Sequence, residues 1–221
     1  MRNLVFRSLI LLAVAVGQSA CETIPPTDGA RIGPFFTPAN VRGVERMPAT
    51  VRRIALLPAA GNAQISEESL TRLDESLLAE LTRTARAETV SVPRDLLARL
   101  AGSRQIDSTA ALPHDLLSKI KAVTQADAVV FVDITSYSAY PPLMIGIRSK
   151  LVDLSTADIL WAFDSIFDAS IPMVKNAARR HQLADAPNLG MKADMTTVIL
   201  QNPTRYASYV GAAMFTTLPR R

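Results

Sequence analysis

The stretch ADAVVFVDITSYSAY, residues 126–140, decides the fold. Its centre is apolar at consecutive positions, so both faces of the extended chain carry apolar side chains. Strands of this kind lie inside sheets that are covered on both faces, whereas a strand with one face in water alternates apolar and polar residues. We therefore predict an interior strand with helices on either side of its sheet.

Shorter elements are predicted before this strand. RRIALLP (52–58) and ETVSV (88–92) are typical of strands, and helices are predicted after Ser66, Pro93 and Pro113. The helix after Ser66 has one apolar face, formed by Leu70, Leu73, Leu77, Leu78 and Leu81.

Two runs after the long strand, residues 143–154 and 159–170, predict a hairpin. A turn centred on residues 156 and 157 would pair Lys150 with Phe163 and place Arg148 and Lys150 beside aromatic rings. Helices are predicted from Pro172 and from Asn202-Pro203. The expected fold class is α/β, a mixed β-sheet with flanking helices in an α/β sandwich.

The N-terminus predicts export. Two arginines, a short apolar run and the small pair Ser19-Ala20 form a signal peptide over residues 1–20. Cys21, the only cysteine, follows directly. Cleavage there would leave either a soluble periplasmic protein or one anchored through lipid on Cys21, and a lone thiol in an oxidising compartment favours the lipid.

Ser19, Ala20 and Cys21 resemble the bacterial lipobox, which implies a diacylglyceryl group, with palmitate-type chains, on Cys21. Gln18 departs from the aliphatic residue usual at that position, and Glu22 is not the aspartate that marks inner-membrane retention. The resemblance therefore implies a lipid anchor in the outer membrane, with the protein facing the periplasm.

We predict three parts: the signal peptide 1–20, a lipidated proline-rich tether 21–50, and a single α/β domain 51–221. The alternative for the second part is that Ile32, Phe35 and Phe36 pack on the domain or on a neighbouring subunit.

Composition argues against several functions. After removal of residues 1–20 the chain has 22 basic and 20 acidic residues, a net charge of +2, and no basic stripe for nucleic acid. His114 and His181 have no metal-ligand spacing and are expected on the surface. Asp164 and Asp168 would lie about 13 Å apart along a strand, too far for a glycosidase pair. We predict no catalytic residue, metal or cofactor, and hence no enzyme.

RRIALLP, ADAVVFVDITSY and LVDLSTADILWAF resemble the periplasmic domain of curli-secretion-channel lipoproteins (CsgG-like), a type shared with the secretion lipoprotein PelC, lipoprotein activators of penicillin-binding proteins, and the N-terminal domain of TolB. The resemblance implies a non-enzymatic envelope lipoprotein acting as an assembly, scaffold or secretion-accessory module. The alternative is a monomeric tethered regulator of a cell-wall enzyme, and a hydrolase is the least favoured third class.

The predicted interaction patch is Arg148, Lys150, Trp161 and Phe163, which would bind envelope proteins or a further copy in a homo-oligomer. In the alternative, a helix covers the aromatic residues and they belong to the core. Lys175, Arg179 and Arg180 on a later helix form either a solvated face or a surface for anionic lipid, lipopolysaccharide or polymer.

Overall fold

The computed structural model describes residues 29–185 and 193–221, which form a mixed sheet of six strands in the order β1-β6-β5-β4-β2-β3. The strands are β1 Val41–Gly43, β2 Arg53–Leu56, β3 Glu88–Ser91, β4 Ala128–Ser138, β5 Met144–Asp153 and β6 Ile159–Asp168. β2 runs parallel to β3 and β4, and the other pairs are antiparallel. The predicted α/β class is confirmed.

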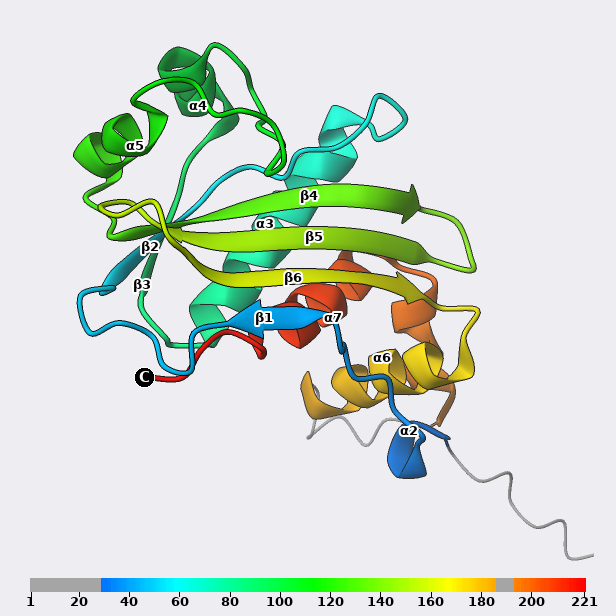
Figure 1. Cartoon of the computed structure of the whole chain (residues 1–221). Coiled ribbons are helices and arrows are strands. Elements are labelled where there is room, and N and C mark those ends of the chain that lie inside the picture. The colour runs from blue at the N-terminus through cyan, green and yellow to red at the C-terminus, as the bar shows by residue number, and fades with distance from the viewer. Residues whose placement is uncertain (1–28, 186–192) are drawn as a thin grey trace, which may run out of the picture.

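Helices lie on both sides of this sheet (Figure 1). They are α2 Gly29–Ile32, α3 Glu67–Arg83, α4 Arg94–Ala101, α5 Leu116–Thr124, α6 Pro172–Asp185, the 3-10 helix η1 Ala193–Leu200, and α7 Pro203–Phe215. In Figure 1 strands β4, β5 and β6 pass in front of α3 and α7, which cover the rear face. Helices α4 and α5 form a separate, smaller group near β2 and β3.

Local sequence explains where these helices begin. The Ser66 hydroxyl accepts a hydrogen bond from the Ser69 N–H at 3.2 Å and starts α3. The Asn202 side chain does the same for the Arg205 N–H at 3.1 Å, ahead of Pro203 in the first turn of α7. These N-caps satisfy N–H groups that have no partner within the helix.

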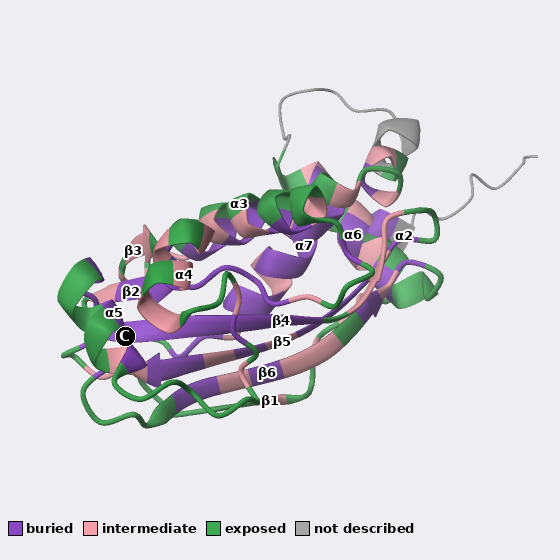
Figure 2. Ribbon diagram, turned by 90° about the horizontal axis from the view of Figure 1, so that it is seen from above, coloured by how far each residue is buried: buried purple, intermediate pink, exposed green. Residues whose placement is uncertain are grey.

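Strand β4 separates two cores, which explains its continuous apolar run. Val130 and Val132 face the larger core with α3, α6 and α7, whereas Val129 and Phe131 face the smaller core with α4 and α5. Figure 2 shows the central strands and the inner faces of the helices as buried. The interior strand predicted from residues 126–140 is confirmed.

The segment that precedes β2 is packed on the domain and does not form a free tether. Phe36 donates its N–H to the Met173 carbonyl at 3.1 Å, and its ring meets the Phe167 ring edge-on at 5.4 Å. Strand β1 pairs with β6 through Val41 and Phe163, and Met47 is buried. The tether prediction is therefore wrong for the docked segment, residues 33–50, and the alternative in which Phe36 packs on the domain is correct.

The C-terminus holds the other end of the docked segment. The Met47 N–H donates to the Arg220 carbonyl at 2.8 Å, and the Arg221 guanidinium donates to the Val51 carbonyl at 3.0 Å. The predicted domain start at residue 51 thus moves toward the N-terminus. The signal peptide and Cys21 lie outside the described residues.

His181 differs from the surface residue predicted. It is half-buried, and its ring lies 6.0 Å from the Tyr209 ring. Burial lowers the pKa of His181, opposed by the nearby Asp185 carboxylate. The apolar positions of α6 turn this histidine toward α7, which its neighbours in sequence did not indicate.

Candidate functional site: the open face of the β5–β6 hairpin

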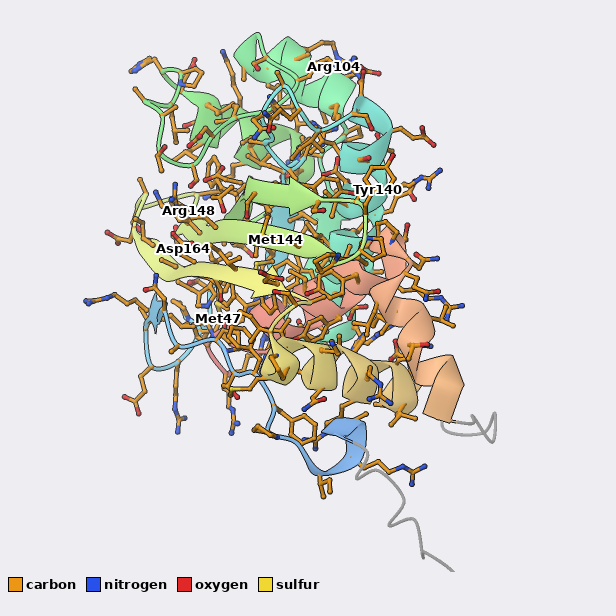
Figure 3. All side chains as sticks on the ribbon, turned by 90° about the vertical axis from the view of Figure 1, so that its right-hand side faces the viewer. Met47, Arg104, Tyr140, Met144, Arg148 and Asp164 are labelled. Atoms are coloured by element: carbon orange, nitrogen blue, oxygen red, sulfur yellow. The ribbon has the colours of Figure 1, made fainter. Side chains whose placement is uncertain are left out.

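The front face of the β5–β6 hairpin is the part of the sheet that the described helices leave uncovered. Helices α4 and α5 reach only the apolar side chains of β2, β3, β4 and the end of β5. The loop before α5 reaches one step further, where the Lys150 ammonium donates to the Ser108 carbonyl at 2.7 Å. Beyond this contact the face is open to solvent, and Ile166 is 54% exposed on it. Figure 3 shows Arg148 and Asp164 on this side of the sheet and Met144 near its centre.

A row of charges crosses three strands of the open face. Arg148 of β5 lies opposite Asp133 of β4 and Asp164 of β6 in the two registers. Its Nε donates to the Asp164 carboxylate at 3.2 Å. Both side chains of this pair are partly exposed, and such pairs contribute roughly 0–1 kcal/mol to stability. The fold therefore depends little on Arg148 and Asp164.

Asp133 is the buried member of this row. Its carboxylate accepts hydrogen bonds from both the backbone N–H and the hydroxyl of Ser108. Burial raises the pKa of Asp133, and the hydrogen bonds from Ser108 act against that rise. Asp133 thus ties the loop before α5 to β4 and fixes the upper border of the open face.

An apolar row follows the charged one. Gly146 of β5 lies opposite Ile166 of β6 and Ser136 of β4, and Met144 lies one step further along β5. A β-bulge at Thr135 places the hydroxyls of Thr135 and Ser136 directly over Gly146. A Cβ atom added to Gly146 would overlap both hydroxyl oxygens. The absence of a side chain at Gly146 lets the strands meet closely and leaves Met144 and Ile166 as the apolar groups of the face.

The four residues of the predicted patch do not share a surface. Arg148 and Lys150 lie on the open face, but Trp161 and Phe163 are 1% and 2% exposed in the larger core. Trp161 stacks on Phe163 at 5.8 Å, and its Nε1 donates to the Thr217 hydroxyl at 3.1 Å. The prediction of one continuous patch is wrong, and the alternative in which these aromatic residues belong to the core is correct.

The cause is a one-residue error in the predicted hairpin register. Lys150 lies opposite Ala162, not Phe163, and a bulge near Leu160 shifts the pairing toward the turn. Because side chains alternate between faces, a shift of one residue moves every side chain of one strand to the other face. In the turn itself, Ala157 has a φ of 63°, in the left-handed region.

The open face also contains Asp133, Asp164 and Ile166, which do not belong to the interaction patch predicted from sequence. The sequence places Asp164 only in a rejected acid pair with Asp168. The alternation along β6 could have indicated this face. Ala162, Asp164, Ile166 and Asp168 occupy every second position of the strand and therefore lie on the same side of the sheet.

A second hollow lies at the carboxyl ends of β2 and β3, where ligands often bind in open α/β sheets. It has a volume of about 310 Å³, and Asp74 and Arg94 line it. Arg94 pairs with Asp74 at 2.7 Å, and Arg104 pairs with Glu67 at 2.7 Å and also with Asp95. Burial raises the pKa of Asp74. Both arginines of this hollow are already paired with carboxylates, so the open face is the better candidate.

Residues 29–185 and 193–221 contain no group of three or more His, Cys, Asp or Glu side chains able to hold a metal ion. The same residues also contain no helix with the length and hydropathy needed to cross a bilayer.

Comparison with known proteins gives likenesses of structure only. Neither protein-family models nor curated proteins match the chain. The PelC dodecamer from Paraburkholderia phytofirmans is 11% identical, with a TM-score of 0.43, over 82% of this chain and 98% of that chain. Lipoprotein GNA1162 from Neisseria meningitidis is 16% identical, with a TM-score of 0.43, over 61% and 99%. The C-terminal domain of LpoB from Salmonella enterica is 16% identical, with a TM-score of 0.39, over 56% and 87%.

TolB from Acinetobacter baumannii is also similar, at 16% identity and a TM-score of 0.31 over 67% of this chain. PelC and TolB are two of the proteins named in the sequence resemblance, and GNA1162 is a lipoprotein by name. The resemblance to curli-secretion channels stays a prediction.

Proposed function

We propose that this protein is a non-enzymatic lipoprotein of the outer membrane that acts in the periplasm as an assembly, scaffold or secretion-accessory module. It binds a protein partner, either a further copy or another envelope protein, through the open face of the β5–β6 hairpin. The observation that carries the proposal is this face, where a partly exposed ion pair adjoins the exposed Ile166 and the half-buried Met144 on the sheet.

The composition of the face suits protein recognition. Arg148 and Asp164 can exchange their mutual contact for charged groups of a partner, and Ile166 and Met144 supply apolar area beside them. Protein interfaces combine an apolar centre with polar surroundings, and arginine and methionine are enriched in them. Strands β5 and β6 hold these side chains in place, which lowers the entropy lost on binding.

The docked segment favours a module close to the membrane over a regulator that reaches far from it. The predicted tether of residues 22–50 could extend to roughly 90 Å, but only seven residues separate Cys21 from Gly29. A chain of that length spans about 28 Å at most. A lipid on Cys21 would therefore keep the domain near the bilayer, so a partner is expected to come to the domain.

Site-specific photocrosslinking in intact cells tests the proposal. A photoreactive residue at position 166 should give a covalent product with a protein, whereas one at position 123 should not. Val123 is a matched control because it is 52% exposed and belongs to α5, outside the open face. Arg148→Gln should reduce the product from position 166 while leaving urea unfolding nearly unchanged. Equal products from both positions, or none from position 166, would contradict the proposal.

A further inference from the structure

A surface formed by α2 and α6, which we call the α2–α6 surface, combines exposed apolar residues with basic ones. Ile32 of α2 is 65% exposed, and Met173 in the first turn of α6 is 41% exposed. Ile171, just before α6, is also exposed. The basic side chains Arg31, Lys175, Arg179 and Arg180 belong to the same two helices.

The two helices form one unit. The Asn176 amide donates to the Pro34 carbonyl at 3.2 Å, and the Arg180 guanidinium lies 4.4 Å from the centre of the Phe35 ring. Together with the bond from Phe36 to Met173, these contacts fix the chain after α2 along α6. Figures 1 and 3 both show α2 next to α6 at the lower side of the molecule.

The charge of α2 and α6 differs from that of the remaining domain. These two helices contain four basic and one acidic residue, a net charge of +3. The other described residues contain 17 basic and 17 acidic residues, a net charge of zero. The excess positive charge of the described residues thus lies with α2 and α6.

The chain outside the structure enters the domain at this surface. Gly29 begins α2, and Cys21 lies only seven intervening residues earlier. A lipid on Cys21 therefore requires some part of the domain to lie within about 28 Å of the bilayer, and the α2–α6 surface is the part next to the anchor. Apolar side chains flanked by basic ones are typical of peripheral contacts with anionic lipid.

We propose that the α2–α6 surface docks on the anionic phospholipid headgroups of the bilayer, with Ile32 and Met173 at the depth of the interface and Lys175 and Arg179 on the phosphates. The orientation rests on the proposed anchor at Cys21, whereas the affinity of the surface for lipid does not. In this orientation the open face of the hairpin, which points toward the viewer in Figure 1, is roughly perpendicular to the plane of the bilayer. It can then bind proteins attached to the same membrane.

Binding to vesicles tests the inference. The described core is built from residues 30–218, so a chain of residues 22–221 retains it and lacks Cys21. This chain should float with vesicles of phosphatidylcholine and phosphatidylglycerol, should not float with phosphatidylcholine alone, and should be released by salt. Lys175→Gln should weaken binding about fivefold, because one basic residue near an anionic surface contributes about that factor. Lys119→Gln on α5 removes the same charge elsewhere and should leave binding unchanged.

A depth measurement separates insertion from simple attraction between charges. Residues 22–221 contain no cysteine, so Ile32→Cys gives one thiol for a polarity-sensitive dye. Its emission should shift to shorter wavelength on anionic vesicles, while a dye on Val123→Cys should not respond.

Three outcomes would overturn the inference. They are no flotation with either vesicle, equal loss for Lys175→Gln and Lys119→Gln, and binding to soluble polyphosphate without binding to vesicles. Failure of crosslinking at position 166 would remove the hairpin proposal and leave this surface intact, so the two failures are distinguishable.

Discussion

Phe36 provides a direct test of how the docked segment is held. The ring packs edge-on against Phe167, and the backbone N–H bonds to Met173 in α6. Replacing a fully buried phenylalanine with alanine costs about 3–5 kcal/mol. Phe36 is half-buried, so Phe36→Ala should lower the free energy of unfolding by roughly 2 kcal/mol. For a domain of this size that corresponds to a fall in Tm of about 4–8 °C.

Urea unfolding measures the loss, and limited trypsin digestion localises it. Phe36→Ala should speed cleavage at Arg42 and Arg46, because the docked segment opens before the core does. Ile32→Ala is the matched control: its side chain is mostly exposed, and its effect should stay within about 0.5 kcal/mol. A Phe36→Ala variant with the wild-type urea midpoint and wild-type cleavage would refute the docked segment.

Three further predictions concern single positions. Ala157→Gly should raise stability by about 0.5–1 kcal/mol in urea unfolding, since Ala157 adopts a left-handed conformation; no gain would contradict that turn. Gly146→Ala should lower the free energy of unfolding measured in urea by about 1–3 kcal/mol through overpacking against Ser136 and Thr135, and a neutral effect would argue against the bulge. Burial raises the pKa of Glu80, so the folded state holds the proton of this carboxyl group more tightly than the unfolded state does. The free energy of unfolding therefore rises as pH falls from the raised pKa toward 4.5. Glu80→Gln should increase the free energy of unfolding over wild type more at pH ~8 than at pH ~5, and a pH-independent difference would refute this prediction.

Helices α3 to α7 and strands β2 to β6 could be predicted from sequence because each carries its own signal, whereas α2 and η1 could not. The side chains of Ser66 and Asn202 accept hydrogen bonds from the first-turn N–H groups of α3 and α7, and Pro203 fixes the first turn of α7. The run at residues 126–140 has two apolar faces because two cores lie against β4. In these elements local preference and tertiary packing agree.

The docked segment could not be predicted because its apolar residues follow no period. Three of its apolar residues contact different parts of the domain. Phe36 packs on the Phe167 ring, Val41 pairs with the edge of β6, and Met47 bonds to the C-terminus. Strand β1 has three residues, too few for an alternating pattern to appear. Prolines and glycines between these contacts resemble a flexible tether, although tertiary contacts fix them.

The candidate site was only partly predictable, since it depends on register. Arg148 and Lys150 were placed correctly in a strand, but the side of the sheet on which their neighbours lie is set by the bulge near Leu160. A bulge inserts one residue and leaves no clear mark in composition. The assignment of faces, and with it the composition of the open face, therefore required the structure.

The two proposed surfaces have different binding roles. The α2–α6 surface would meet lipid next to the anchor, and the open face, which carries Arg148, Asp164 and Ile166, would meet protein. The two surfaces lie on different sides of the molecule, so both contacts can form at once.

The most direct test of the central claim is the native mass of the protein extracted from membranes in mild detergent, for the wild type and for a variant combining Arg148→Glu with Ile166→Asp. The wild type should carry a lipid on Cys21 and at least one further protein subunit, and the variant should carry the same lipid and be a monomer. A wild type without lipid, or a variant that keeps its partner subunits, would contradict the account.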